Sequence, residues 1–457
     1  MAQPNLFSRR RWLQMTAGGL GVSLPGFLGL KHQASAAATK PARAKRCIVL
    51  YCWGGISHID TWDPKPDASA EIRGEFHTIN TAAPGMRFGE HMPLLAKQAD
   101  KLAVIRSIHH GCTAHGKGMY WNMTGHAPPQ PGAAVNLRPS RDDWPSLAAM
   151  VSKFHDAPRG MPRAVRLPYP LVDNGTLQAG EFGGFMGIAQ DPIVIRTPSG
   201  REYGGVSRAL GSAVLKLNAP LDVVRMRNRR SLLASLERPI GAPDAAASLQ
   251  HFRELANDML LNPDVKRAYN LEKEDPRVRE TYGDHICGHS VLLARRLSEA
   301  GVPIVTVCCA AGDLNGSKGD HWDTHADNFN RLKKQMLPPF DRAAAALLAD
   351  LDQRGLLDET LVVFLTDFGR TPKINKGRGR DHYPNVYSVV LAGGGIRGGQ
   401  VYGTSDSMGA FPKSQACTPA DLHATIFKAL GIPPKSMIQD AIGRRLPISD
   451  GKVLPLA

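Results

Sequence analysis

Residues 360–384 read TLVVFLTDFGRTPKINKGRGRDHYP, and the interpretation of the whole chain begins with this stretch. The apolar run 361–365 is typical of a buried strand. Asp367 follows directly, five basic side chains come next, and Asp381 and His382 close the stretch. A carboxylate at the end of a strand, with an imidazole returning fifteen residues later, indicates a polar site at the edge of a sheet.

Buried strands followed by polar loops recur along the chain. The predicted strands lie at 46–55, 102–108, 302–309, 360–367 and 386–396, the last with its turn at 393–395. Segments with helical period separate them, among them 289–301, 331–355 and 418–432. This alternation predicts an α/β fold, an α/β/α sandwich with a mostly parallel central sheet.

Two further helical segments are predicted between these strands. The region around 212–280 has helical period and is interpreted as an insertion or a cap over the sheet. Asp143 is expected to cap a helix that Trp144 and Pro145 open. No change in composition marks a second domain, so residues 45–457 are predicted to form one domain.

Composition limits the class of protein. The chain has 457 residues, 42% of them hydrophobic, and a net charge of +15, so it can form a large core and attract an anionic partner. No nucleic-acid-binding module is recognisable, and nucleic acid is not an expected partner. The seven cysteines form no C-x-x-C pair, which argues against a disulfide framework and favours buried thiols.

The first residues have the features of an export signal. SRRRWLQ, residues 8–14, matches a twin-arginine motif, and a glycine-rich apolar stretch and the small-residue run 34–38 follow it. We therefore expect residues 1–36 to be a signal peptide read by the Tat machinery. The mature protein is expected in the periplasm or outside the cell, without a stable membrane span.

Histidine and aspartate gather after four of the predicted strands, and imidazole and carboxylate groups are the ligands of hydrolytic metal centres. The four clusters are His58, Asp60 and Asp63; His109, His110, His115 and His126; Asp320, His321, Asp323, His325 and Asp327; and Asp367, Asp381 and His382.

Two interpretations of these clusters remain open. The run DHWDTHADN, residues 320–328, is either a set of metal ligands or a network of turns and caps. Arg370 and Lys373 are placed to meet an anionic oxygen, and Arg370 could do so with two hydrogen bonds. Alternatively, Arg370 pairs with Asp367 or another nearby acid, and His382 is a structural histidine.

Six motifs resemble the DUF1501 family of exported bacterial proteins. They are GGISHIDTWDPKPDA, ARRLSEAGVPIVTV, WDTHADN, LLDETLVVFLTDFGRTPKIN, GRDHYP and LAGGGIRGGQVYGTSD, in that order. The family in turn resembles the alkaline phosphatase and sulfatase superfamily. The C-terminal sequence beginning TPADLHATIFKALGI is similar to a sulfatase pattern.

The resemblance implies a divalent metal, which could be Zn, Ca, Mg or Mn. It implies as metal ligands Asp60, Asp323, His325, Asp367 and His382. Phe368 stands where the superfamily has a histidine after the aspartate. This departure puts a two-metal site in doubt and leaves a single metal ion open.

The nucleophile departs further from the superfamily. CTAHGKGMYWNMTG, residues 112–125, lacks the proline and arginine of the sulfatase motif. Thr113 could act as a hydroxyl nucleophile, His115 as a ligand or base, and Arg370 as the anion contact. The expected function is hydrolysis of phosphate or sulfate esters, with an anionic substrate that could be a sulfated or phosphorylated polymer. The alternative is a non-catalytic envelope or binding protein that keeps the fold.

Overall fold

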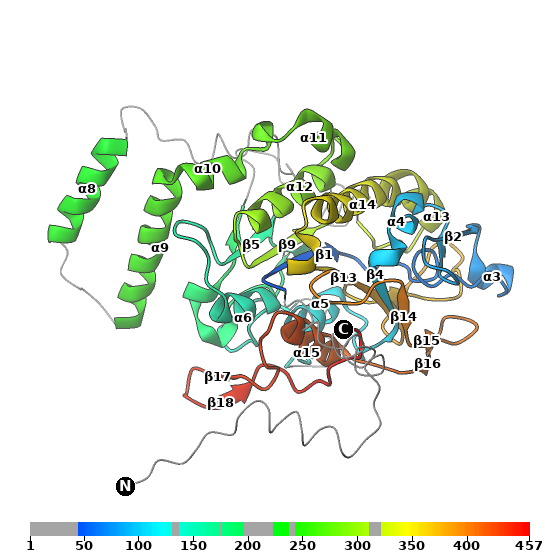
Figure 1. The fold of residues 1–457 in the computed structure, drawn as a ribbon. Helices are drawn as coiled ribbons and strands as arrows, with labels where there is room; N and C mark the ends of the chain where they lie inside the picture. Colours follow the sequence, from blue (N-terminus) through cyan, green and yellow to red (C-terminus); the bar gives the residue numbers. More distant parts are fainter. Residues whose placement is uncertain (1–43, 130–136, 174–175, 196–222, 237–242, 310–320) are drawn as a thin grey trace, which may run out of the picture. The chain divides into compact units, whose positions relative to one another are not determined.

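The computed structural model describes residues 44–129, 137–173, 176–195, 223–236, 243–309 and 321–457 (Figure 1). These residues belong to one compact unit, which begins at Arg43 and ends at Ala457. The predicted signal peptide, residues 1–36, lies outside the described residues and stays a prediction.

The core of the unit is an eight-stranded sheet in the order β14-β4-β13-β10-β1-β9-β5-β8. In sheet order, the strands are β14 Gln400–Tyr402, β4 Leu102–Ile108, β13 Tyr387–Ala392, β10 Thr360–Thr366, β1 Arg46–Cys52, β9 Ile304–Cys308, β5 Ala164–Leu167 and β8 Ile193–Val194. Only β13 runs antiparallel to its neighbours in this sheet. The predicted mostly parallel α/β fold is therefore confirmed.

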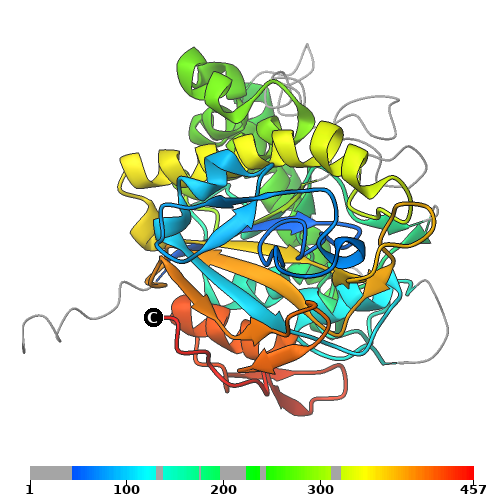
Figure 2. The ribbon, with the colours of Figure 1, turned by 90° about the vertical axis from the view of Figure 1, so that its right-hand side faces the viewer.

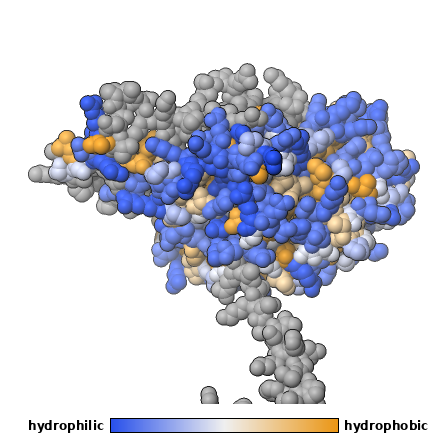
Figure 3. All heavy atoms as spheres, turned by 45° about the horizontal axis from the view of Figure 1, so that its top comes forward, coloured by the Kyte–Doolittle hydropathy of each residue, from blue (hydrophilic) through white to orange (hydrophobic). Residues whose placement is uncertain are grey.

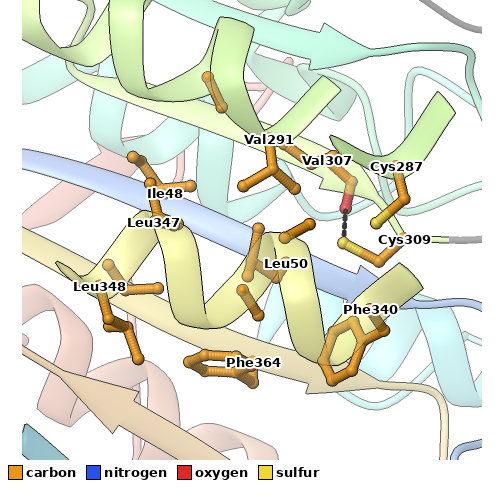
Figure 4. Close-up of a cluster of buried hydrophobic side chains, with 14 of the residues drawn as sticks. Ile48, Leu50, Cys287, Val291, Val307, Cys309, Phe340, Leu347, Leu348 and Phe364 are labelled. Carbon is orange, nitrogen blue, oxygen red and sulfur yellow. Dashed lines mark hydrogen bonds between the residues drawn. The ribbon is translucent and has the colours of Figure 1, made fainter. Parts of the chain in front are cut away.

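Helices cover both faces of the sheet, as Figure 2 shows for α14 on one side and α15 on the other. On one face, α12 Ile286–Glu299 and α14 Leu337–Gln353 pack on alternate residues of β1, including Ile48 and Leu50 (Figure 4). On the opposite face, the other residues of β1, such as Val49 and Tyr51, pack against a second set of helices. That set is α5 His115–Thr124, α6 Leu147–Phe154 and α15 Pro419–Ala429. Side chains alternate across a strand, so a strand buried on both faces is apolar throughout.

The region predicted as a helical insertion contains helices, in the part that the structure describes. They are α8 Val223–Leu236, α9 Pro243–Leu261, α10 Pro263–Tyr269 and α11 Pro276–Tyr282. Val265 and Tyr282 are buried in the same core as α12 and α14. The helices α10 and α11 thus form part of the helical layer, and the insertion boundary at 212 lies outside the described residues.

The cap of α6 differs from the sequence prediction. Ser146, not Asp143, precedes the first helical residue, and its hydroxyl accepts a hydrogen bond from the Ala149 amide at 3.1 Å. The Asp143 carboxylate instead accepts from the Ser140 amide at 2.6 Å. The helix begins after Pro145, so the cap belongs to the serine that follows it.

Short elements complete the described part. The short helices are α3 Ala70–Arg73, α4 Pro93–Ala96 and α13 Asn328–Arg331. Five two-stranded ribbons pair β2 Thr78–Asn80 with β3 Arg87–Gly89, β6 Val172–Asp173 with β7 Thr176–Leu177, β11 Gly369–Arg370 with β12 His382–Tyr383, β15 Thr404–Ser405 with β16 Pro412–Ser414, and β17 Met437–Gln439 with β18 Arg445–Pro447.

Polar residues cover most of the face shown in Figure 3, and the apolar ones form small separate groups. No helix in the described residues is long and apolar enough to cross a membrane. All seven cysteines are buried, in agreement with the sequence prediction of buried thiols.

Candidate metal centre

Three side chains from distant parts of the sequence meet beyond the strand ends. His115 is the first residue of α5, which follows β4. Asp323 lies between β9 and α13, and His382 lies on β12. Ligand atoms of these three residues all lie within 4.8 Å of one another. Parallel strands bring their carboxyl ends to one edge of a sheet, which is why these loops meet.

The imidazole Nε2 atoms converge on the Asp323 carboxylate. The Nε2 of His115 lies 3.3 Å from Oδ2, and the Nε2 of His382 lies 3.1 Å from Oδ1. His325, which is more exposed, places its Nε2 3.1 Å from the same Oδ1 and 2.9 Å from the Nε2 of His382. Ligand atoms of a tetrahedral zinc site lie about 3.3 Å apart, given bonds near 2.05 Å. The distances from Asp323 to His115 and His382 are close to that value, whereas His325 lies beside the group whose ligand atoms are all within 4.8 Å of one another and is not part of it.

The other ring nitrogen of each histidine faces a fixed acceptor. The Nδ1 of His115 bonds to Asp367 Oδ2, the Nδ1 of His325 to Asp381 Oδ1 at 2.7 Å, and the Nδ1 of His382 to the Thr113 carbonyl at 2.6 Å. A carbonyl only accepts, so the Nδ1 of His382 carries the proton. When the ring is neutral, its Nε2 then has a free lone pair.

These residues fit a divalent cation. Three lone pairs aimed at one carboxylate repel one another unless a proton or a cation lies among them. The buried Nε2 of His115 makes no aligned hydrogen bond, although Asp323 is near. Histidines whose second nitrogen is held by a carboxylate or carbonyl are the usual arrangement around protein-bound metals.

Asp367 lies behind His115 rather than inside the group. The sequence predicted it as a ligand, but it is fully buried and its Oδ2 holds the His115 ring. Its Oδ1 accepts the amides of Gly54 and Gly55, both at 3.1 Å. Gly54 has φ of +103°, and a Cβ there would lie 2.6 Å from the Asp323 amide nitrogen, so only glycine fits this turn.

Arg370 forms a buried ion pair with Asp323. Its guanidinium donates to Asp323 Oδ1 at 2.5 Å, to the Gly55 carbonyl at 2.9 Å, to the Arg380 carbonyl at 3.1 Å and to the Gly54 carbonyl. The side chain is fully buried. The interpretation in which Arg370 pairs with a nearby acid matches this geometry, with Asp323 as the acid. Arg370 was predicted to contact a substrate anion, but its side chain exposes no atom that could make this contact.

Asp60, the ligand predicted from the first cluster, has other partners. Both of its oxygens accept from the buried guanidinium of Arg380, at 2.9 and 3.1 Å, and Asn328 donates to it at 2.9 Å. Neither Asp60 nor Arg380 exposes its side chain. Asp60 therefore belongs to a buried ion pair and is not a member of the group of His115, Asp323 and His382, because a bidentate guanidinium occupies both of its carboxylate oxygens.

Phe368 forms an apolar wall of the centre. Its ring packs on His115 at a centroid distance of 4.9 Å and on His382 at 4.7 Å. A Cβ on Gly55 would lie 2.9 Å from this buried ring. Phe368 therefore places carbon, not a ligand nitrogen, beside His115 and His382.

The charges of the centre shift the pKa values of its groups. Burial lowers the pKa of His115, but Asp367 and Asp323 outweigh it and raise the pKa to about 9. Burial acts to raise the pKa of Asp323, but Arg370 and the histidines hold it far below its usual range. Burial lowers the pKa of His382. Asp323 is therefore ionised at neutral pH, as a metal ligand must be.

Thr113, the predicted nucleophile, lies two residues before α5. Its carbonyl accepts from His382, so its backbone is part of the centre, and its side chain is exposed. Asp381 and His110 belong to the clusters seen in the sequence, and the structure gives each of them a contact at the centre. Asp381 orients His325, and the Nε2 of His110 bonds to the Asp367 carbonyl at 2.6 Å. In the sequence, only the position of Asp381 next to His382 indicated that Asp381 would lie near the centre.

The family of the chain follows from its sequence as a whole. Residues 44–456 match the family model described as a protein of unknown function, DUF1501. The chain belongs to the DUF1501 family. No curated protein matches this DUF1501 protein in sequence.

Solved structures of low sequence identity are similar to this DUF1501 protein over most of its length. Ps i-CgsB is 11% identical with a TM-score of 0.40, over 85% of this chain and 72% of its own. PsFucS1 sulfatase from Pseudoalteromonas sp. is 13% identical with a TM-score of 0.36, over 88% and 70%. A TAB5 alkaline phosphatase mutant with Mg bound in its M3 site is 13% identical with a TM-score of 0.39, over 86% and 99%.

Proposed function

We propose that this DUF1501 protein is an exported, metal-dependent hydrolase of phosphate or sulfate esters. The observation that carries the proposal is the convergence of three imidazole Nε2 atoms on the Asp323 carboxylate, each ring held from behind through Nδ1. A solvated turn network would not need three histidines with fixed tautomers around one acid.

Zinc is the ion that this donor set favours. His115, His325, His382 and Asp323 would hold the ion, and imidazole suits Zn²⁺ better than it suits Ca²⁺, Mg²⁺ or Mn²⁺. A bound ion of this kind polarises an ester oxygen and lowers the pKa of a hydroxyl or water. Asp367, Asp381 and the Thr113 carbonyl would keep the rings in place.

The remaining roles belong to the chain itself. The Thr113 hydroxyl, exposed beside the centre, or a water molecule would attack the ester. Arg370 acts through Asp323, which it holds in position, and is a positioning residue. The net charge of +15 supports an anionic substrate, which includes sulfated or phosphorylated polymers.

Metal analysis with an ester assay tests this proposal. Purified mature protein should contain a single zinc ion per chain and hydrolyse 4-nitrophenyl phosphate or 4-nitrophenyl sulfate. His382→Ala should lose both the metal and the activity. His77→Ala, which removes an exposed histidine outside the centre, should keep both. A metal-free wild type that hydrolyses neither ester would contradict the proposal.

One observation favours a non-catalytic envelope or binding protein instead. Arg370 is the arginine whose guanidinium bonds to the Asp323 carboxylate, and it is fully buried. A site without an exposed cation binds a phosphate or sulfate group less strongly. A wild type that binds zinc but turns over no ester in the panel would support this second function.

Export by the Tat route is part of the proposal and rests on the motif SRRRWLQ. Replacing Arg9 and Arg10 together by Lys should hold the uncleaved precursor in the cytoplasm. Cell fractionation with an antibody against the mature domain measures this. Normal export of the double variant would contradict the Tat assignment and leave the hydrolase proposal intact.

A further inference from the structure

A cleft of about 540 Å³ opens between the end of α6 and the β17–β18 ribbon, two elements that lie next to each other in Figure 1. Three segments of the chain line it. Lys153 comes from α6, Phe185 and Gln190 come from the loop between β7 and β8, and Gln439 and Arg445 come from the ribbon. The cleft is thus built from parts of the chain that only folding brings together.

The cleft and the metal centre lie at opposite edges of the sheet. The end of α15 lies at the start of β1, because the Ala44 amide donates to the Ala429 carbonyl at 2.8 Å. The ring of His155, directly after α6, donates from Nε2 to the Leu430 carbonyl at 3.0 Å, so α6 ends at the same edge. A strand of seven residues such as β1 spans about 23 Å. A small ester bound at the metal centre therefore does not reach the cleft.

Two cations of the cleft have no acid as a partner. Lys153 and Arg445 are both exposed, and in the part of the chain that the structure describes neither makes an ion pair. Asp440, the one acid among the lining residues, already has partners. Its Oδ2 accepts from the Arg444 guanidinium at 2.7 Å, and its Oδ1 accepts from the amides of Ile442 and Arg444 at 3.1 and 2.8 Å. The cleft therefore presents two uncompensated positive charges to solvent.

The other lining residues have the chemistry that recognises a sugar. Phe185 and Met186 are partly exposed and offer an apolar surface for the face of a sugar ring. Gln190 and Gln439 carry amides, which can both donate to and accept from hydroxyl groups. Gln439 pairs with Arg445 in the ribbon, so their side chains lie on the same face. Sites for single-stranded nucleic acid stack successive bases on several aromatic rings, whereas Phe185 is the one aromatic residue of this lining.

We propose that this cleft binds an anionic polysaccharide, whose sulfate or phosphate groups contact Lys153 and Arg445. A guanidinium forms two parallel hydrogen bonds with such a group, and an ammonium attracts it as a point charge. The net charge of +15 draws a polyanion to the surface, and the cleft gives the preference for a sugar. This binding requires neither a metal ion nor ester hydrolysis, so the inference goes beyond the proposed function and does not depend on it.

Polymer binding tests the cleft directly. Fluorescein-labelled dextran sulfate, dextran phosphate and neutral dextran of equal length are titrated with the mature protein at about 0.15 M salt, where weak surface attraction is screened. The wild type should bind a charged dextran and not the neutral one, and the tighter of the two charged polymers identifies the anionic group. The double variant Lys153→Gln, Arg445→Gln should weaken this binding about fivefold or more, with an unchanged melting temperature.

A matched control separates the cleft from the net charge. The double variant Lys334→Gln, Lys413→Gln removes the same charge from two exposed lysines outside the cleft. It should weaken the binding by less than about twofold, because charges far from the polymer are screened. Equal weakening in the two double variants would show that the net charge, not the cleft, holds the polymer.

Two further results would overturn the inference. The first is a wild type that binds neither charged dextran. The second is an oligothymidylate that binds as tightly as the charged dextrans and is weakened as much by Lys153→Gln, Arg445→Gln, which would make the ligand a nucleic acid. A wild type that binds a charged dextran but hydrolyses no ester would contradict the hydrolase proposal and support this inference.

Discussion

The groups that bond to the Nδ1 atoms of the histidines determine how the rings are oriented toward a metal ion. Asp367 accepts a hydrogen bond from the Nδ1 of His115, and two glycine amides and burial hold Asp367 in place. Such outer partners set the tautomer and the direction of a metal-binding ring. Their removal is therefore expected to change metal affinity without a change in the ligands themselves.

Asp367→Asn tests this at constant size. If the amide oxygen keeps the Gly54 and Gly55 amides, the amide nitrogen faces His115 and forces the ring proton onto Nε2, which can then no longer bind a metal. Zinc affinity should fall about 10- to 100-fold, as measured by competition with a chelating dye. Asp406→Asn, in the β15–β16 loop, serves as the control. Unchanged affinity would show that Asp367 does not orient the ligand.

The buried pair of Asp60 and Arg380 provides a prediction about stability. Arg380→Met leaves the Asp60 carboxylate buried with Asn328 as its remaining side-chain donor. Removing one partner of a buried pair costs about 3–5 kcal/mol, because an uncompensated charge remains. Urea unfolding measures this loss. The double variant Asp60→Leu, Arg380→Met should recover part of it, and equal losses in both would contradict the ion-pair account.

At the scale of elements, a buried charge network joins α12 to α14 and to the turn after α10. Arg295 on α12 is fully buried and contacts Glu274 and also, at 2.9 Å, Asp350 on α14. The Tyr282 hydroxyl donates to Asp350 at 2.8 Å, which ties α11 to the same group. The network thus fixes four elements of one helical layer through charge-assisted hydrogen bonds.

This network makes stability depend on pH. Burial acts to raise the pKa of Glu274, but Arg295 and Arg296 outweigh it and lower the pKa from 4.5. A carboxyl with a lowered folded pKa contributes stability that is complete above its unfolded pKa and is lost as the pH falls through its folded pKa. The free energy of unfolding should therefore decline between about pH 5 and pH 3.

Glu274→Gln should make this decline less steep, and Glu272→Gln, in an exposed acid two residues away, should not. Urea unfolding at each pH provides the free energies. A slope identical in wild type and Glu274→Gln would show that the network does not carry the pH dependence.

At the scale of the whole molecule, the centre joins segments that are far apart in the sequence. His115, Asp323 and His382 come from three different connections between strands and helices. An ion bound only by the folded state stabilises that state, by about 2.7 kcal/mol when its free concentration is 100 times Kd. The melting temperature of the wild type should fall when a chelator is added.

His382→Ala provides the control for this measurement, since a chelator should leave its melting temperature unchanged. A wild type that melts at the same temperature with and without chelator would show that no ion contributes to stability. It would also favour the interpretation of DHWDTHADN as a turn network.

The sequence by itself determined the architecture. The predicted strand at 102–108 became β4 with the same bounds, those at 46–55 and 360–367 became β1 and β10 with the same first residue, and β13 begins one residue after its predicted run. Six ordered motifs indicated the family, and the match over residues 44–456 confirms it. Hydrophobic period and family motifs are local signals, so they can be read without knowledge of which segments meet.

The choice among equivalent side chains depended on the tertiary structure. The sequence alone does not indicate that Asp60 pairs with Arg380, 320 positions away, or that Arg370 pairs with Asp323. Asp323 and His382 were predicted as ligands and lie together, while His115, predicted as a ligand or base, joins them. A carboxylate binds the donor that is nearest in space, and that distance is set by the packing of the strands and loops, not by sequence.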